Sequence, residues 1–462
     1  MAIELVDRER EIELLRTHAG RPPALVVMRG RRRVGKSFLL RFAFPDGRVV
    51  GFQADEQPET AQLTLLAQEA SRILPGAPPL VFPDWYAALD FFEAQAKTGG
   101  ALVVVLDEFQ WLGRSQPALP SMIQQRWDTW DREQTPLALI LSGSALSYME
   151  GLFQRTSPTF GRSVYRPLIL PLSYKDTPPF ARDGASAQEI VERFAVVGGT
   201  PQYQRWAGRE PIEQVIESAI LEPDASLYEE PLHLLRGEES IRTPGPYFAS
   251  LAAIAAGLTR PVDLAGRLGV AQPTALEYLD RLAGLGYIEE FNPIEPHHKG
   301  DARGVWRIRD PYFRFWFRFV FPNRSRLARG RIDDVAKEIE VGFETYLGGI
   351  FEDCCREWIG RFSALGSAAD LVGSWWNRKS DAEIDVVALD KAGYTLLGSC
   401  KWWKRSVGEN VLDELYEHRA LLGKPAAQAE LALFSRGGFT SDLEGRAKRE
   451  GVHLFTVEHL FS

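Results

Sequence analysis

The sequence predicts a multidomain α/β protein that begins with a parallel β-sheet. Short apolar runs alternate with helical stretches from the start to about residue 205. Apolar strands separated by helices are typical of a parallel sheet that is covered on both faces. The chain has 462 residues, which is more than one hydrophobic core normally holds. We therefore expect several domains, and we assign the sheet to residues 1–205.

The strands of the first domain are predicted from short apolar runs. These runs are Leu25–Met28, Val49–Phe52, Leu102–Leu106, Leu137–Leu141 and Leu168–Leu170. Helical periodicity without strands follows from residue 186 to about 240. We interpret residues 206–242 as a helical lid or linker.

A glycine-rich loop joins the first predicted strand to a helix. Its sequence fits the P-loop pattern GxxxxGK[ST], and the strand and helix on either side are the context that this motif requires. Glycines let the backbone surround phosphates, and the dipole of the following helix attracts the same anion. We expect Lys36 to reach the β- and γ-phosphates, which makes it a catalytic candidate, and Ser37 to bind Mg²⁺. The candidate nucleotide-binding residues are Gly30, Arg31, Arg32, Arg33, Val34, Gly35, Lys36, Ser37 and Phe38.

The third predicted strand ends in two carboxylates, Asp107 and Glu108. Open α/β sheets bind ligands at this edge. Together with the P-loop, the pair predicts that Asp107 holds Mg²⁺ and that Glu108 deprotonates the attacking water. The fourth strand ends in Ser142-Gly143-Ser144, and these small polar residues, Ser142 in particular, are interpreted as a γ-phosphate sensor or as ordinary turn chemistry. Arg162 is interpreted as a catalytic arginine acting on a neighbouring subunit or as a surface arginine.

Residues 243–335 are predicted to form a winged helix-turn-helix. Helical stretches at 247–257, 261–268 and 273–284 precede two short strands, Tyr287–Phe291 and Gly304–Ile308. Three helices and a hairpin are the elements of that fold. The third helix carries Glu277 and Asp280 against one Arg281, which is a poor surface for DNA. A protein-docking role for this domain therefore stays open.

The stretch 299–331 is strongly basic and rich in aromatic residues. It has two acids, Asp301 and Asp310, against ten bases: Lys299, Arg303, Arg307, Arg309, Arg314, Arg318, Arg324, Arg326, Arg329 and Arg331. The arginines are interpreted either as nucleic-acid phosphate contacts, DNA more than RNA, or as partners in salt bridges. The spacing of Phe313, Trp316, Phe317 and Val320 predicts a buried helical face rather than a base-stacking surface.

Six motifs, in order over residues 3–235, resemble the archaeal-type ATPase family of the AAA+/STAND branch. They are Val6-Asp7-Arg8-Glu9, RGRRRVGKS, LDEFQWL, SGSALSYM, FGR and GGTPQY. The resemblance implies a five-stranded P-loop NTPase core, a nucleotide that is ATP rather than GTP, and Arg8 near the adenine. The sequence has no NKxD-type guanine motif, which agrees with ATP.

Residues 336–462 are predicted to form a compact α/β module with strands at 383–389 and 394–402. The segments IRDPYFRFWFRFV, GGIFEDCCREW, EIDVVALD and LLGSCKWW resemble a nuclease-like domain of the DUF234 type. That domain is similar to the restriction-endonuclease superfamily. The resemblance implies a Mg²⁺ site with Glu352 and Asp385, and a catalytic Lys401.

One position departs from the nuclease-like pattern. Ser399 stands where the third motif, Glu-x-Lys, has its carboxylate, and a hydroxyl is a weaker ligand for Mg²⁺. Glu383 lies two residues before Asp385 and so faces the same side of its strand, which allows partial compensation. An active nuclease, a degenerate domain that binds nucleic acid and a structural domain all stay open.

Bulk composition excludes several classes of protein. Hydrophobic residues make up 45% and charged residues 25%, and no apolar run approaches the roughly 20 residues of a membrane span. The net charge of −8 argues against a protein that coats nucleic acid along its whole surface. The three cysteines lack the spacing of a zinc site or a disulfide scaffold. The first residues show no secretory signal, so we expect a cytoplasmic protein.

Three functions follow from these features, and we rank them in this order. The first is a Mg²⁺-dependent ATPase that works as a switch or motor at nucleic acid. The second is a STAND-type signalling ATPase that changes its oligomeric state and binds protein partners. The third is an ATP-regulated nuclease. All three predict ATP and Mg²⁺ as cofactors, and a homo-oligomer is compatible with each.

Overall fold

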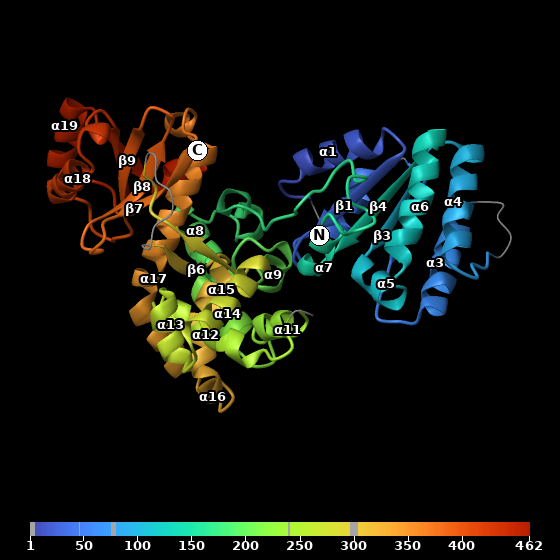
Figure 1. The fold of residues 1–462 in the computed structure, drawn as a ribbon. Helices are drawn as coiled ribbons and strands as arrows, with labels where there is room; N and C mark the ends of the chain where they lie inside the picture. Colours follow the sequence, from blue (N-terminus) through green and yellow to red (C-terminus); the bar gives the residue numbers. More distant parts are fainter. Residues whose placement is uncertain (1–4, 46, 75–79, 239–240, 296–303) are drawn as a thin grey trace. The chain divides into compact units, whose positions relative to one another are not determined.

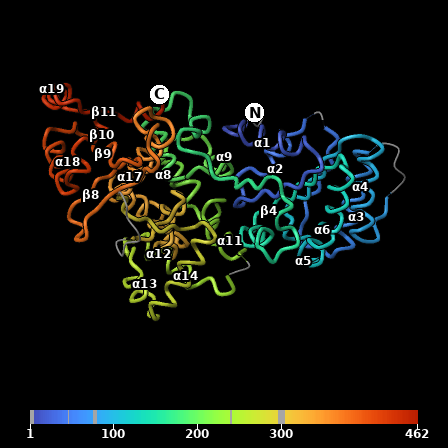
Figure 2. The backbone as a smooth tube through the Cα atoms, turned by 45° about the horizontal axis from the view of Figure 1, so that its top comes forward, coloured from blue at the N-terminus to red at the C-terminus, as the bar shows by residue number. Residues whose placement is uncertain are grey.

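The computed structural model describes residues 5–45, 47–74, 80–238, 241–295 and 304–462. The chain divides into two compact units (Figures 1 and 2). The first contains residues 1–172, with 200–202 and 238–240, and the second contains 173–199, 203–237 and 241–462. The first unit therefore ends before the predicted boundary at residue 205. The four-domain division made from the sequence stays a prediction.

The first unit contains a four-stranded parallel sheet in the order β1-β4-β3-β2. Its strands are β1 (Ala24–Arg29), β2 (Val49–Gln53), β3 (Leu102–Asp107) and β4 (Leu137–Gly143). All four coincide with predicted strands. Every residue of β4 is buried, as expected for a strand covered on both faces.

The predicted fifth strand, Leu168–Leu170, is wrong as a strand. The chain does run beside β1 there, because Tyr165 and Pro167 accept hydrogen bonds from β1 at 3.0 and 2.9 Å. Only two isolated bridges form, at Tyr165 and Leu168. Pro167 has no N–H to donate, so a continuous ladder of hydrogen bonds cannot form at this edge. The five-stranded core implied by the resemblance is thus a four-stranded sheet with an irregular edge segment.

Helices cover both faces of this sheet (Figure 1). On one face Leu25, Val27 and Leu139 pack against α3 to α6, and on the other Val26 and Ile140 pack against α1 and α2. The alternation follows from the two-residue period of a strand. The helices are α1 (Glu9–Ala19), α2 (Lys36–Ala43), α3 (Glu59–Ile73), α4 (Trp85–Gly99), α5 (Phe109–Ser115), α6 (Leu119–Glu133) and α7 (Leu146–Gly151).

The second unit opens with helices, as the periodicity after residue 186 predicts. They are α8 (Ala187–Val197), α9 (Pro201–Trp206), α10 (Ile212–Val215), a π-helical turn (Ile216–Leu221) and α11 (Glu230–Arg236). Ser186 caps α8 reciprocally with Glu189. Buried residues of α8 belong to the large apolar core of the second unit, which explains why this helix separates from the sheet of the first unit.

Three helices and an antiparallel hairpin follow in the predicted order. They are α12 (Gly245–Ala255), α13 (Pro261–Leu268), α14 (Gln272–Gly284), β5 (Ile288–Phe291) and β6 (Val305–Ile308). The next helices are α15 (Pro311–Phe315), a π-helical turn (Trp316–Val320) and α16 (Arg324–Leu327). Phe313, Trp316, Phe317 and Val320 are at most 1% exposed. They form the buried face that their spacing predicts and are not a base-stacking surface.

The C-terminal part is a five-stranded mixed sheet in the order β11-β10-β9-β8-β7. The strands are β7 (Leu371–Trp376), β8 (Glu383–Leu389), β9 (Tyr394–Lys401), β10 (Glu430–Ser435) and β11 (His453–Thr456). The long helix α17 (Ile332–Arg361) covers one face, while α18 (Glu409–Leu422) and α19 (Ser441–Glu450) cover the other (Figures 1 and 2). Of the residues described, none belongs to a helix with the length and apolarity of a membrane span.

Candidate nucleotide and metal sites

The P-loop connects β1 to α2, and its two glycines are required by the backbone. A Cβ at Gly30 would lie 2.5 Å from the carbonyl oxygen of Ile169. Gly35 has φ +96°, a conformation that side chains disfavour, and nothing lies within 4 Å of the position of its missing Cβ. No side chain caps the N-terminus of α2. The amides of the first turn are thus available to an anion such as a phosphate.

Lys36 is held by the loop that it follows. Its side chain is buried, and Nζ donates to the carbonyl oxygens of Gly30 at 2.8 Å and Arg31 at 3.2 Å. Burial lowers the pKa of Lys36, and the nearby carboxylates of Glu108 and Asp107 oppose this effect. An ammonium group has three donors, so this arrangement fits a further hydrogen bond to a phosphate.

The remaining P-loop residues differ in their exposure. Val34 is buried, whereas Arg32 and Arg33 are exposed. Arg32 acts on Lys36 electrostatically and contributes to the lowered pKa of that lysine. Phe38 is half-buried and lies 4.7 Å from Phe42, measured between ring centroids. The exposed guanidinium groups add positive charge beside the predicted phosphate position.

Ser37 and Asp107, the two predicted Mg²⁺ ligands, contact each other. The hydroxyl of Ser37 donates a short hydrogen bond to Oδ2 of Asp107. Asp107 ends β3 and is buried, while Ser37 is the second residue of α2. A hydroxyl and a carboxylate are oxygen ligands of the kind that Mg²⁺ takes. The donor set therefore fits this ion.

Glu108 is fixed by two side chains, Ser144 and Gln110, for which no contact with this carboxylate was predicted. Ser144 donates to its Oε2 at 2.6 Å, and Gln110 donates a short hydrogen bond to the same oxygen. Glu108 itself has φ +54°, which is uncommon for a residue with a side chain and occurs where function imposes strain. Ser144 lies within the motif SGSALSYM and Gln110 within the motif LDEFQWL, so the sequence contained both signals.

Ser142, the predicted γ-phosphate sensor, lies inside β4. It is fully buried, and its hydroxyl makes no hydrogen bond to the residues that the structure describes. In the register of the sheet, Ser142 pairs with Met28 of β1. Its sensor role stays a prediction, and Ser144 is the serine of this motif that contacts Glu108.

Arg8 connects the N-terminal helix to the P-loop. It is buried and donates to the carbonyl oxygens of Leu170 at 2.6 Å and Val34 at 3.4 Å. Glu11 forms an ion pair with it at 3.1 Å. Arg8 thus supports the backbone of the P-loop, and its predicted place near the adenine stays a prediction.

Arg162, the predicted catalytic arginine, is paired within its own unit. Its Nε and Nη2 donate to the carboxylate of Asp128 at 2.8 and 3.0 Å. This hydrogen bonding raises the pKa of Arg162. A bidentate pair of this kind restricts the side chain. Action on a neighbouring subunit would require the arginine to leave Asp128.

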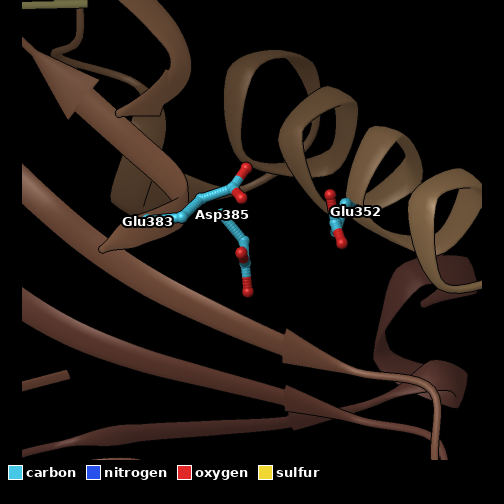
Figure 3. A group of neighbouring side chains, drawn as sticks. All are labelled: Glu352, Glu383 and Asp385. Carbon is cyan, nitrogen blue, oxygen red and sulfur yellow. The ribbon is translucent and has the colours of Figure 1, made fainter. Parts of the chain in front are cut away.

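The second unit brings Glu352, Glu383 and Asp385 together (Figure 3). One carboxylate oxygen from each lies within 4.8 Å of the others. Glu352 projects from α17 toward β8, which carries the other two (Figure 3). Three oxygen ligands on a helix and a strand fit a divalent cation such as Mg²⁺. The proximity of Glu383 agrees with the expectation that it faces the same side as Asp385.

The electrostatics of this cluster show mutual repulsion between carboxylates. Burial, followed by the charge of Asp385, raises the pKa of Glu352 to about 8. Burial and Asp385 also raise the pKa of Glu383. Arg356 opposes both shifts and lies 3.7 Å from Glu352. A bound cation would relieve this repulsion, because it favours the ionised form of each carboxyl group.

Ser399 occupies the position of the missing third acid and contacts the cluster. Its hydroxyl lies 3.1 Å from Oδ2 of Asp385, and the amide of Cys400 donates to the same oxygen at 2.7 Å. Lys401 follows on β9 and opposes the raised pKa of Glu383, which places its charge near the cluster. All four predicted residues of this site, Glu352, Glu383, Asp385 and Lys401, therefore lie in one region.

Most arginines of the stretch 299–331 are neutralised within the second unit. Lys299 and Arg303 lie outside the described residues. Of the others, Arg307 and Arg309 pair with Glu289, Arg307 and Arg314 with Asp353, Arg324 with Glu229, Arg326 with Glu338 and Arg331 with Asp334. All these acids lie outside the stretch itself. The salt-bridge interpretation thus accounts for most of the local charge. Arg318 and Arg329 have no carboxylate partner in the described part of the chain.

Comparison with known proteins identifies a family segment in the second unit. Residues 316–411 match DUF234, a family described as archaeal and bacterial proteins of unknown function. The chain carries a DUF234 segment. This segment includes Glu352, Glu383, Asp385, Ser399 and Lys401, so the acidic cluster lies within it.

Similarity to whole proteins extends well beyond the DUF234 segment. An uncharacterized protein of Methanocaldococcus jannaschii is 28% identical over 426 residues, covering 90% of this chain and 92% of the relative. A solved structure of a Walker-type ATPase from Pyrococcus abyssi aligns with a TM-score of 0.52 and 21% identity, covering 68% of this chain and 96% of that one. The ORC2 protein of Aeropyrum pernix aligns with a TM-score of 0.46 and 15% identity, over 73% of this chain and 96% of that one.

The similarity to the Walker-type ATPase shows a shared fold. It agrees with the parallel sheet, the P-loop position and the mixed α/β architecture described above. The predicted fold class is thus confirmed: a P-loop ATPase-like core with a separate C-terminal α/β sheet domain that carries the DUF234 segment.

Proposed function

We propose that the first unit binds ATP with Mg²⁺ and hydrolyses it. The contact between Ser37 and Asp107, beside the ammonium of Lys36, is the observation that carries this proposal. The P-loop provides the ammonium to the phosphates and the hydroxyl to Mg²⁺, and the carboxylate at the end of β3 is the second protein ligand expected for Mg²⁺. The exposed arginines of the loop and the uncapped helix α2 add positive potential for a polyphosphate.

Glu108 supplies the base in this proposal. Its carboxylate stands at the carboxyl end of β3, next to Asp107, and takes a proton from the attacking water. Ser144 and Gln110 both donate to Oε2, which leaves Oε1 as the oxygen that accepts the proton. Lys36 would hold the β- and γ-phosphates, and Ser37 and Asp107 would hold Mg²⁺, which would supply further positive charge to the same groups.

The test is steady-state ATP hydrolysis with matched variants. Lys36→Ala should abolish nucleotide binding, because the phosphates lose their main cation. Glu108→Gln should retain binding of ATP but reduce turnover by about 10²-fold or more. Normal hydrolysis by Glu108→Gln would remove Glu108 from the role of base. Absence of ATP binding by the wild-type protein would remove the proposal itself.

We propose further that ATP turnover serves as a switch or motor at nucleic acid, DNA more than RNA, in the cytoplasm. The three-helix and hairpin segment has the elements of a winged helix, and it precedes the carboxylate cluster along the chain. Hydrolysis should be measured with and without single- and double-stranded DNA and RNA at two salt concentrations. Stimulation that weakens with salt supports this function, because phosphate contacts release counterions.

A signalling ATPase with protein partners is the second candidate. It is favoured by the extensive pairing of arginines in the stretch 299–331, which leaves fewer of them for phosphate contacts. Under this proposal ATP changes the oligomeric state, and nucleic acid leaves turnover unchanged. Light scattering with and without ATP separates the two candidates. A constant mass together with salt-sensitive DNA binding would exclude the signalling role.

A metal-dependent nuclease is the third candidate. Its support is the cluster of Glu352, Glu383 and Asp385 with Lys401 nearby. The carboxylates would hold the cation, and the lysine would steady the scissile phosphate. Cleavage of DNA or RNA with Mg²⁺ or Mn²⁺ that disappears in Asp385→Ala supports this activity. Absence of cleavage with either metal leaves the cluster without that role.

A further inference from the structure

A cavity of about 400 Å³ lies between the turn that follows α12, strand β6 and the helix after it. The side chains of Arg307, Arg314 and Arg318 line its wall, together with Trp306 and the exposed residues Ala256 and Gly257. Among the described residues, no aspartate or glutamate lines it. The cavity is thus a concave surface with three cations and no anion of its own.

The two acids that neutralise this region lie outside the cavity and are shared. The carboxylate of Asp353 forms ion pairs with the guanidinium groups of Arg307 at 2.8 Å, Arg314 at 2.9 Å and Arg356 at 2.6 Å. These arginines hold the pKa of Asp353 well below its usual range, even though burial alone would raise it. Asp353 is therefore a fixed anion. One carboxylate shared by three guanidinium groups leaves positive charge uncompensated.

Glu289, the second acid, is shared in the same way. Arg307 contacts it at 2.6 Å and Arg309 at 3.3 Å. Glu289 and Asp353 thus pair with four arginines in this part of the unit, and Glu352 lies 3.7 Å from Arg356. Arg307 and Arg314 also line a second cavity that contains both acids, whereas Arg318 is a further cation at the first cavity alone.

Arg318 is the least satisfied of the three arginines. It is half-buried, and its recorded contacts are with the rings of Phe319 and Tyr346, at 5.3 and 5.9 Å from the guanidinium carbon to the ring centroids. It has no hydrogen-bond acceptor and no carboxylate in the described part of the chain. An anion in the cavity would satisfy its donors.

We propose that this cavity binds a phosphate monoester. Guanidinium groups donate pairs of hydrogen bonds that match phosphate oxygens, and a dianion balances more positive charge than a carboxylate. The volume exceeds that of phosphate alone and lies within the range of small-molecule sites, so a sugar or base fits beside Trp306. The source is either a free nucleotide or the 5′-phosphate of a nucleic-acid strand. The proposal does not depend on ATP hydrolysis at the P-loop.

Calorimetry on the full chain tests this site, with Lys36→Ala as the background so that the P-loop does not contribute. The probes are inorganic phosphate, adenosine monophosphate, and a six-nucleotide DNA with either a 5′-phosphate or a 5′-hydroxyl. Arg318→Ala should weaken phosphate binding by about tenfold or more. Arg329→Ala is the matched control, because this exposed arginine of the same stretch does not line the cavity.

A second pair of variants changes the charge of the cavity without touching an arginine. Ala256 is exposed at the wall, so Ala256→Glu adds a carboxylate there while Ala256→Gln adds the same volume without charge. Binding of phosphate should fall with Ala256→Glu and persist with Ala256→Gln. Thermal unfolding of each variant establishes that it is folded. ATP hydrolysis by the wild-type protein is measured separately, because this proposal does not depend on it.

The results distinguish three cases: a free nucleotide as the ligand, the phosphorylated end of a strand as the ligand, and no specific phosphate site. Tighter binding of adenosine monophosphate than of the 5′-phosphorylated strand assigns the cavity to a free nucleotide, and the reverse assigns it to a strand end. Absence of phosphate binding overturns the proposal. Equal losses in Arg318→Ala and Arg329→Ala, or equal affinity for the 5′-hydroxyl and 5′-phosphate strands, also overturn it, because general electrostatic attraction then suffices.

Discussion

The hydroxyl of Ser144 donates a hydrogen bond of 2.6 Å to Oε2 of Glu108. Gln110 donates to the same oxygen and lies 3.3 Å from the hydroxyl of Ser144, so the three side chains form a closed group. Ser144 and Gln110 are both buried. A carboxylate that is fixed by two buried donors is held in one orientation, which is what a general base beside a nucleotide requires.

Ser144→Ala should lower kcat for ATP hydrolysis by about tenfold and leave KM nearly unchanged, because the base loses its orientation while nucleotide binding does not. Ser142→Ala is the matched control on the same strand end. A larger effect of Ser142→Ala would instead support the sensor role predicted for Ser142. Steady-state kinetics of both variants decide between the two serines.

Arg8→Ala should destabilise the first unit by about 1–3 kcal/mol, because the buried carbonyl of Leu170 loses its charged donor. We also expect weaker ATP binding, since the contact with Val34 supports the P-loop. Arg10→Ala, an exposed arginine on the same helix, should change neither quantity. Thermal unfolding and ATP titration measure the two effects. Equal behaviour of the two variants would contradict a supporting role for Arg8.

Arg162 and Asp128 offer a test of catalysis by a neighbouring subunit. If Arg162 acts there, Arg162→Ala lowers turnover strongly, whereas Asp128→Asn frees the arginine and preserves turnover. We expect this asymmetry, with a loss of about 10-fold or more in Arg162→Ala. The pair is exposed enough that its contribution to stability is small. Small and equal losses of turnover in Arg162→Ala and Asp128→Asn would show that the two residues form only a surface ion pair.

Glu352 predicts a pH dependence of stability in the absence of divalent metal. Its pKa is about 8 in the folded protein, above its ordinary value of 4.5, so the folded state holds this proton more tightly. The associated stability is present below pH 4.5 and is lost as the pH rises through about 8. Glu352→Gln should therefore match the wild type near pH 5 and exceed it at pH 9, on the order of a few kcal/mol.

Thermal unfolding with a chelator at pH 5, 7 and 9 measures this effect. Glu357→Gln is the control, because Glu357 lies on the same helix and pairs with Arg361 rather than with the cluster. Equal stability of Glu352→Gln and the wild type at pH 9 would show that Glu352 ionises without cost.

Ser399→Glu should add the carboxylate of the third motif to the cluster, as a fourth acid, and raise the affinity of the cluster for Mg²⁺ by about tenfold or more, because added ligand charge strengthens binding of this ion. Ser399→Gln has a similar size without the charge and should not gain affinity. Asp385→Asn should lose it. Calorimetry with Mg²⁺ and without nucleotide measures all three. A site that binds no metal would show Asp385→Asn and the wild type alike.

The sequence by itself determined the parts of the protein that depend on neighbouring residues. The P-loop, the carboxylates after β3, four strands of the first sheet and the three-helix segment were readable because backbone geometry and apolar period are encoded within short segments. The prediction of a fifth strand was wrong for a local reason that was also present in the sequence. Pro167 lies next to the predicted run and cannot complete a ladder.

Only the tertiary structure decided which charged and polar groups meet. Arg8 donates a hydrogen bond to the carbonyl of Leu170, 162 positions away in the sequence. Glu108 accepts one from Ser144, 36 positions away in the sequence. Within the sequence the stretch 299–331 has few acids of its own. Acids from elsewhere in the chain, such as Glu229 and Asp353, nevertheless neutralise most of its described arginines. The physical reason is that an ion pair needs only proximity in space, and folding brings together residues whose separation along the chain carries no signal. In the same fold the guanidinium of Arg318, at the wall of the cavity, has no hydrogen-bond acceptor among the described residues.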